Sequence, residues 1–368
     1  MTITEREQHI LECLRADPMI SQQALADRLN ISRSAVAVHI MHLMQKGYVA
    51  GKGYILAEQS YVAVVGGANI DLSGRSAAAL RMGDSNPGSL SVSPGGVGRN
   101  IAENLARLGS VVQFFSVVGQ DAWGDQLLAA CRSAGVGVDH VLRPADVSTS
   151  VYLSVLDADG EMKLALNDMA ALKYLDATAL EKRAGFLDRA PLWVLDANLS
   201  EESLYWLFQR RAHQRVIVDT VSAAKVGRLI PYLDRIHTLK PNALEAEVLT
   251  GVVVQDAASA KQAVAVLHDK GVERVFLTLG GQGALYSVSG SSLWLDALPV
   301  QVVNVTGAGD AALAAITHAT LQDWDAEHSA RFAMAAAALA TTSAHTIHPH
   351  LSETALLQLL EASDAKIP

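Results

Sequence analysis

The chain has 368 residues, of which 50% are hydrophobic and 18% are charged, and its formal net charge is -9. This length predicts roughly two or three domains, and the composition excludes a disordered chain. Cys13 and Cys131 are the only cysteines, which excludes a disulfide framework and a cysteine-based metal site. The N-terminus is polar, with no apolar signal segment, and no apolar run approaches about 20 residues, so we expect a cytoplasmic protein.

The charge is unevenly distributed along the chain. Residues 1–57 carry six lysines and arginines against five acidic residues, whereas the remainder carries 23 against 33. The larger part is therefore not a general binder of polyanions, although a local phosphate site remains compatible with its charge.

Residues 1–57 are expected to form a compact helical unit. An apolar helical pattern ends at Asp17-Pro18, and Ser21 and Ser32 are N-caps for a second and a third helix, with a tight turn between them. Two short strands are expected within residues 47–56. This order is the plan of a winged helix-turn-helix, and the segment that begins at Ser21 resembles that motif in bacterial regulators.

In such a motif, the start of the third helix enters the major groove of DNA. We expect the following residues to face DNA, the last of them as a phosphate contact on the wing: Ser32, Arg33, Ser34, Val38, His39 and Lys52. The weakly positive charge predicts modest affinity per subunit, so useful binding requires a homodimer. The alternative is a helical domain that is used only for protein contacts.

After a short polar join, the pattern changes at Tyr61 to alternating strands and helices. The expected strands are 61–67, 111–118, 192–196, 216–219, 236–240 and 275–279, and the expected helices are 101–108, 123–134, 201–213, 243–250 and 259–270. This alternation predicts an α/β domain over residues 61–368, with a mostly parallel sheet and helices on both faces. From Ala311 onward the chain is expected to be largely helical.

Two stretches interrupt this alternation. Residues 72–93 are rich in serine, glycine and asparagine, and residues 150–167 predict a β-hairpin. We expect them to form a small separate sheet that acts as a lid and keeps water out of an active site.

The segment Asn304-Val305-Thr306-Gly307-Ala308-Gly309-Asp310 precedes a run of small helix-forming residues. Glycines directly before a helix leave backbone N–H groups exposed, and the helix dipole favours an anion there. A carboxylate beside such an anion hole, here Asp310, suits a base that takes a proton from a hydroxyl group. The alternative is that Asp310 only stabilises the first turn of the helix.

Two segments offer groups for an acceptor substrate. Asn69 and Asp71 follow the first strand at its carboxyl end, where open α/β sheets bind ligands, and they suit vicinal hydroxyls; the alternative is a turn role. Gly95 and Gly96 permit close approach of a ligand, and Asn100 follows in the first turn of a helix. The spacing of a dinucleotide-binding fingerprint is absent.

Two other segments offer groups for a nucleotide. Asn242 and Glu245 form a capping-box pattern, which is sufficient as a structural explanation. The functional alternative places them near nucleotide phosphates, with Glu245 organising Mg²⁺ through water. Thr278 to Gly283 is a glycine-rich turn after a strand and offers backbone donors. The P-loop sequence is absent from the chain.

Together these segments resemble the ribokinase-like family of carbohydrate kinases, the phosphofructokinase-B type. The likeness covers about residues 61–360 and depends on three motifs in the same order, at 95–100, 242–245 and 304–310. It implies a ribokinase-like fold and an ATP- and Mg²⁺-dependent phosphotransferase that acts on an alcohol group.

The resemblance also implies roles for single residues. Asp310 would be the catalytic base, and the backbone amides of Gly307, Ala308 and Gly309 would form the anion hole. Substrate hydroxyls would be held by Asn69, Asp71, Gly95, Gly96 and Asn100, and the nucleotide by Asn242, Glu245, Thr278, Gly280, Gly281, Gly283 and Thr306. Many relatives use a monovalent cation, but Asn304 stands where several carry an acid, so this cation is left open.

Within the family, residues 84–88, 94–102, 166–169 and 237–242 look most like the pseudouridine kinases. This likeness implies phosphoryl transfer to the 5′-hydroxyl of pseudouridine, with Asn86, Asn167 and Asp168 reading the base from the lid. Two alternatives remain open. One is a kinase for another nucleoside or a pentose, and the other is a transcription regulator that uses the kinase fold as a ligand sensor.

Overall fold

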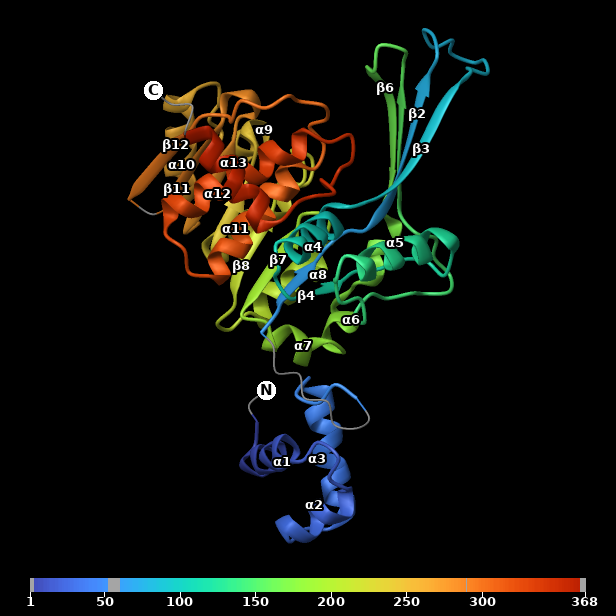
Figure 1. The fold of residues 1–368 in the computed structure, drawn as a ribbon, viewed down its shortest axis with the longest axis vertical. Helices are drawn as coiled ribbons and strands as arrows, with labels where there is room; N and C mark the ends of the chain where they lie inside the picture. Colours follow the sequence, from blue (N-terminus) through green and yellow to red (C-terminus); the bar gives the residue numbers. More distant parts are fainter. Residues whose placement is uncertain (1–2, 52–59, 289, 365–368) are drawn as a thin grey trace.

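The computed structural model describes residues 3–51, 60–288 and 290–364 (Figure 1). Its N-terminal part consists of three helices, α1 (Glu5–Ala16), α2 (Gln22–Leu29) and α3 (Arg33–Gln45). Ser21 and Ser32 cap α2 and α3 as predicted, because each hydroxyl accepts a hydrogen bond of 3.1 Å from a backbone amide three residues on. Asn30 ends α2 in the left-handed conformation and makes the tight turn. The expected wing residues from Lys52 to Leu56 lie outside the described part of the chain.

The larger part is built on an eight-stranded sheet in the order β12-β11-β10-β9-β8-β7-β1-β4. The strands from β4 to β10 in this order are parallel, whereas β11 and β12 are antiparallel. Their bounds are β1 Val62–Val65, β4 Val112–Phe115, β7 Leu192–Asp196, β8 Arg215–Asp219, β9 Thr238–Lys240, β10 Arg274–Thr278, β11 Ala284–Val288 and β12 Ser291–Leu295. The predicted α/β fold with a mostly parallel sheet is confirmed, and the antiparallel hairpin at one edge adds to it.

Helices cover both faces of this sheet, because its central strands are apolar on both sides. Ala63 and Val65 of β1 contact one layer, formed by η1 (Ala170–Tyr174), α6 (Ala177–Glu181), α7 (Ala184–Arg189), α8 (Glu201–Arg210), η2 (Val226–Arg235), α9 (Ala243–Thr250) and α10 (Ala257–Asp269). Val62 and Val64 contact the other, formed by α4 (Val97–Arg107), α5 (Ala122–Ser133) and α11 (Ala308–Leu321). On α11 pack α12 (Ala326–Thr341) and α13 (Glu353–Asp364). Among the described residues, no helix has the length and apolarity needed to cross a membrane.

A second sheet, the lid sheet, extends away from the body (Figure 1). Its strands are β3 (Gly88–Gly95), β2 (Asn69–Ser76), β5 (Val151–Leu156) and β6 (Met162–Asp168), in that spatial order. The pairing register gives it two different faces. Asp71 lies in one row with Ser93, Tyr152 and Asn167 on a polar face. The opposite face carries Leu72, Leu90, Val92, Leu153, Val155, Leu164 and Leu166.

The N-terminal helices contact the body through the end of α3. A Cβ placed on Gly185 of α7 would lie 2.3 Å from the carbonyl oxygen of Gln45, so the two backbones are in close contact. The guanidinium of Arg189 lies over the ring of Tyr48, 5.2 Å from its centroid. The start of α3 and the whole of α2 therefore lie on the side away from the body (Figure 1).

Candidate active site

The chemistry-bearing residues meet at the carboxyl edge of the parallel sheet. Asp196, Asp219 and Lys240 are the last residues of β7, β8 and β9, which are neighbours in the sheet. In open α/β sheets this edge is where ligands bind. The first turn of α11 reaches the same place, because Asp310 interacts electrostatically with all three residues.

The segment before α11 has the geometry of an anion hole. Gly307 is the N-cap of α11 and has a φ of +85°, and a Cβ there would lie 2.1 Å from the carbonyl oxygen of Thr346. Only glycine fits both conditions. Ala308 and Gly309 then begin the helix, whose N-terminus favours negative charge. The backbone amide of Thr306 donates to Oδ1 of Asn304 over 3.0 Å, and this bond fixes the approach to Gly307.

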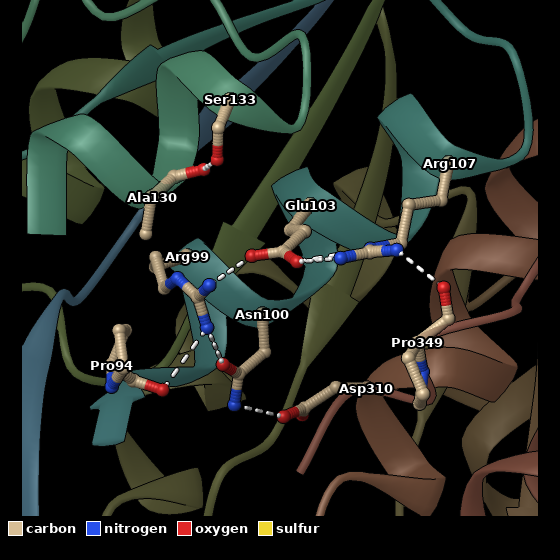
Figure 2. A network of polar contacts seen from close by, with 9 residues as sticks. All are labelled: Pro94, Arg99, Asn100, Glu103, Arg107, Ala130, Ser133, Asp310 and Pro349. Carbon is tan, nitrogen blue, oxygen red and sulfur yellow. Dashed lines mark hydrogen bonds and ion pairs between the residues drawn. The ribbon is translucent and has the colours of Figure 1, made fainter. Parts of the chain in front are cut away.

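Asp310 is half-buried in the first turn of α11, and its Oδ2 accepts a hydrogen bond of 2.8 Å from Nδ2 of Asn100 (Figure 2). Burial, together with the negative charge of Asp219, raises the pKa of Asp310 to about 7. The hydrogen bond from Asn100 and the charge of Lys240 act in the opposite direction. A carboxyl group with a pKa near neutrality can both take up and release a proton under physiological conditions, which suits a general base.

Lys240 is a site residue that the sequence reasoning did not single out. Its Nζ lies 3.1 Å from Oδ2 of Asp219, and both side chains are buried. Burial disfavours the ammonium, but the carboxylates of Asp219, Glu245 and Asp310 raise its pKa above the usual value, so the residue stays charged. The only signal in the sequence was its position at the end of a buried strand.

Asp196 was also not predicted, and it joins two parts of the substrate side. Its Oδ2 accepts hydrogen bonds from the backbone amides of Gly67 (2.8 Å) and Gly98 (2.9 Å). Burial raises its pKa to about 6. These bonds hold the end of β1 against the start of α4. Between them Gly96 has a φ of +98°, and a Cβ there would lie 2.6 Å from the backbone of Ala68, which explains the glycine.

The predicted sugar-binding residues come from the lid strands β2 and β3 and from the start of α4, and of these Asn100 contacts Asp310. Nδ2 of Asn69 donates to Oδ1 of Asp71 over 2.7 Å, and β2 pairs with β3 so that Asn69 is opposite Gly95. Burial raises the pKa of Asp71, while Asn69 and the charge of Arg99 lower it. Asn100 contacts Asp310 from α4. This group offers carboxylate and amide groups to the hydroxyls of a sugar.

The lid residues expected to read the base are separated in the structure. Asn167 lies in the row of Asp71 on the polar face of the lid sheet. Asp168, the last residue of β6, accepts a hydrogen bond of 3.0 Å from the amide of Ala170. Asn86 instead closes the turn before β3. Its Oδ1 accepts a hydrogen bond from the backbone amide of Arg81, and its Nδ2 donates to the carbonyl oxygen of the same residue. In the structure its side-chain amide is used by this turn.

Three of the predicted nucleotide residues, Asn242, Thr278 and Gly280, line a cleft of about 260 Å³. It is lined by Asn242, Ala243, Leu244, Val254, Thr278, Leu279, Gly280 and Gln282. Gly280 begins η3 (Gly280–Gln282) and Gly281 has free space around its Cα, so backbone donors are accessible. Gly283 serves packing instead, since a Cβ there would lie 2.0 Å from the carbonyl oxygen of Leu295 in β12.

Glu245 has the capping role that the sequence allowed. Its backbone amide donates to Oδ1 of Asn242 over 2.9 Å, and its Oε2 accepts from the amide of Asn242 over 2.8 Å and from the hydroxyl of Thr220. Its Oε1 accepts one bond of 2.9 Å, from Nδ2 of Asn242, and keeps a lone pair. This arrangement fits a Mg²⁺ held through a water molecule rather than directly.

The residues expected to face DNA are divided between two environments. Ser32, Arg33, Ser34 and Val38 are exposed at the free end of α3. The ring of His39 faces α1 instead. One of its ring nitrogens lies within 4.8 Å of a carboxylate oxygen of Glu7 and of a ring nitrogen of His42, and its Nδ1 is buried. His39 is therefore half-buried, with part of its ring turned toward α1.

Comparison with known proteins identifies two matching families. Residues 59–354 match the family described as pfkB family carbohydrate kinase, and residues 3–50 match the family described as winged helix-turn-helix DNA-binding. Pseudouridine kinase of Escherichia coli K12 is 41% identical over 310 residues, covering 84% of this chain and 99% of that protein. The uncharacterized sugar kinase YeiI of the same bacterium is 40% identical over 359 residues, covering 97% and 99%.

Solved structures give the same result for the larger part. A carbohydrate kinase from Agrobacterium tumefaciens superimposes with a TM-score of 0.73 at 30% identity, covering 82% of this chain and 97% of that one. Ribokinase of Arabidopsis thaliana, solved with ribose and ATP, superimposes with a TM-score of 0.72 at 26% identity, covering 82% and 99%.

The pKa of Asp310 predicts a pH-dependent gain in stability for Asp310→Asn. The unfolded carboxyl has its ordinary pKa of 3.8, whereas the folded one has a pKa of about 7, so the native state is progressively destabilised as pH rises between these values. Asparagine removes this penalty and can still accept the bond from Asn100. We expect a Tm gain on the order of a few degrees above pH 7 that disappears near pH 4. A gain that does not change with pH, measured by calorimetry, would contradict this ionisation.

Proposed function

Because the chain belongs to the pfkB family of carbohydrate kinases, we propose that it is a nucleoside kinase that phosphorylates the 5′-hydroxyl of pseudouridine with ATP. The observation that carries this proposal is the half-buried Asp310 at the start of α11, which is bonded to Asn100 and lies beside the Gly307–Gly309 turn. This arrangement places a base and an anion hole next to each other, which is what phosphoryl transfer to an alcohol requires.

The proposed mechanism assigns one task to each group of residues. Asn69, Asp71 and Asn100 hold the sugar so that its 5′-hydroxyl lies within hydrogen-bond reach of Asp310. The Asp310 carboxylate takes the hydroxyl proton as the oxygen attacks the γ-phosphorus, and ADP leaves. The backbone amides of residues 307–309 donate to the oxygens of the transferred group, where negative charge develops.

Kinases of this family use ATP and Mg²⁺. We assign the nucleotide to the cleft formed by Asn242, Thr278 and Gly280, and the Mg²⁺ to Glu245 through water. The Mg²⁺ neutralises phosphate charge when it is bound. Lys240 supplies a fixed positive charge between Asp219 and Asp310, independent of the metal. The monovalent cation of some relatives has no assigned residue, because Asn304 bonds Thr306 and the carbonyl oxygen of Ala344.

The choice of pseudouridine depends on the relative that carries that name and on the lid. Pseudouridine presents one more N–H donor on its base than uridine does, so a site selective for it needs an additional acceptor. Asn167 lies in the row of Asp71 on the polar face and can provide one through its side-chain oxygen. Asn167 is exposed, and a hydrogen-bonding group that a bound substrate covers can discriminate strongly between two substrates.

A panel of acceptors tests the reaction and its substrate. We expect ADP release with pseudouridine to exceed that with uridine, other nucleosides or ribose, and Asp310→Asn to lower kcat by about 10³-fold or more while the fold is retained. Near-normal turnover in Asp310→Asn would refute the base. Preference for another acceptor would make that compound the substrate in place of pseudouridine. Ligand-dependent DNA binding with no turnover for any acceptor would favour the alternative of a sensor.

We propose that the N-terminal helices bind DNA. Their family match, the exposed Arg33 at the start of α3 and the attachment of α3 by its opposite end support this role, because the reading end of the motif is left accessible. The modest charge of this part implies that few phosphate contacts form per subunit.

Salt dependence tests this binding. We expect the affinity of the full chain for bacterial promoter DNA to fall steeply as salt rises, and Arg33→Ala to weaken it. Arg28→Ala, which removes an exposed arginine at the end of α2, is the matched control and should have the smaller effect. Affinity that is indifferent to salt would contradict binding in the groove.

We also propose that two copies of the chain pair through the apolar face of the lid sheet. Leu90 is 85% exposed and Leu166 58% exposed, and they belong to a continuous apolar surface on four strands. A sheet with this composition needs a cover, because exposed apolar faces of this kind promote association. A second copy brings an identical apolar face. Pairing would also place two helix-turn-helix units in one complex, which compensates for weak DNA contacts per subunit.

Charge placed on either face of β3 tests this pairing. We expect the full chain to be dimeric by light scattering, and Leu90→Asp to make it monomeric at the same concentration. Ser91→Asp adds the same charge on the opposite face of the same strand and should leave the dimer intact. A monomeric wild-type chain, or a dimer that survives Leu90→Asp, would rule out this surface.

A further inference from the structure

Arg99 lies in the first turn of α4 with only 4% of its surface exposed. Its Nη1 donates to the carbonyl oxygen of Pro94 over 3.1 Å and to Oδ1 of Asn100 over 3.0 Å, and its Nη2 pairs with Glu103 (Figure 2). Burying a charged group is unfavourable unless it is paired and hydrogen-bonded in this way. The result is an immobilised guanidinium directly behind the residue that bonds Asp310.

We propose that Arg99 is a positioning residue that fixes the side-chain amide of Asn100, so that its NH₂ group faces Asp310. An asparagine amide can turn by a half rotation and exchange Oδ1 and Nδ2 with little change in shape. The guanidinium carries only donors, so it binds the Oδ1 end. The Nδ2 end is then left for Asp310, 2.8 Å away. This inference depends on the proposed function, in which Asp310 is the base.

The orientation of the amide matters because Asp310 must lose its proton inside the protein. An NH₂ donor stabilises the carboxylate, whereas a reversed amide would direct the lone pairs of Oδ1 at it and favour the protonated form. The other charged groups around Asp310 are Asp196 on β7, Asp219 on β8 and Lys240 on β9. Those around Arg99 are Glu103 on α4 and Asp71 on β2, and the buried thiol of Cys131 on α5 lies beside it in its neutral form, because burial raises the pKa of this thiol.

The same network contains a matched control. The Oε1 of Glu103 accepts two bonds from Arg107, of 2.9 and 2.8 Å, and Nη1 of Arg107 donates to the carbonyl oxygen of Pro349 over 2.9 Å (Figure 2). Arg107 is therefore an arginine on the same helix with the same carboxylate partner. None of its hydrogen bonds goes to Asn100 or Asp310, so its loss tests a purely structural effect.

The test compares Arg99→Met with Arg107→Met in the full chain, using kcat/KM for the best acceptor of the panel as a function of pH. We expect Arg99→Met to lose roughly 10- to 100-fold and to shift the acidic limb of the profile to higher pH, because the base becomes harder to deprotonate. Arg107→Met should keep the wild-type limb. Should Arg99→Met fail to fold, Arg99→Lys is the second variant. Lysine keeps the charge but lacks the planar set of guanidinium donors, so it should shift the acidic limb in the same direction.

Asn100→Ala shows whether Arg99 acts through Asn100. Adding Arg99→Met to that variant should change kcat/KM by less than about twofold, whereas independent roles would give additive losses. A readout without turnover is the pH at which the stability gain of Asp310→Asn levels off, which should be higher in the Arg99→Met background. An unshifted acidic limb, an unshifted stability curve or additive losses would overturn the positioning role. A wild-type chain without turnover would instead remove the proposed function, and the stability curve would still decide on Arg99.

Discussion

The half-buried carboxylate of Asp310 is the group whose ionisation the rest of this site controls. It lies in a region that already holds Asp196 and Asp219, so its ionisation is opposed by both burial and like charge. Three features make ionisation accessible again: the amide of Asn100, the ammonium of Lys240 and the N-terminus of α11. The outcome is a pKa of about 7, which belongs to the whole assembly rather than to one side chain.

This balance requires segments from distant parts of the sequence to meet, and the parallel sheet provides the meeting place. Neighbouring strands β7, β8 and β9 end at the same edge, and each ends in a charged residue. The lid sheet begins there as well, because β2 starts at Asn69, four residues after the end of β1. The N-terminal helices contact α7, which leads into the opposite end of β7, so the surface that we propose to face DNA and the carboxyl edge lie on different sides of the sheet.

Local patterns in the sequence predicted much of this arrangement, since caps, glycine turns and apolar strands depend on neighbouring residues. They predicted the strand over 192–196, the helix over 243–250 and the position of Asp310 in the first turn of a helix. Lys240 and Asp219 could not be predicted as a buried pair, because they come from different strands whose register is set by the whole sheet. The turn contact of Asn86 was missed for a related reason: an asparagine before Pro-Gly is compatible both with binding a ligand and with closing its own turn.

The same physical balance distinguishes a kinase from a sensor built on the kinase fold. A protein that only binds a nucleoside gains nothing from an ionisable group at position 310, because asparagine could accept the same bond from Asn100 and would avoid the penalty of a buried charge. The chain instead carries the aspartate and surrounds it with groups that bring its pKa near neutrality. Lys240 is equally difficult to explain as a binding residue alone, since it is buried and its charge is directed at three carboxylates. A group that is unfavourable for stability and tuned for proton transfer argues for chemistry at this site.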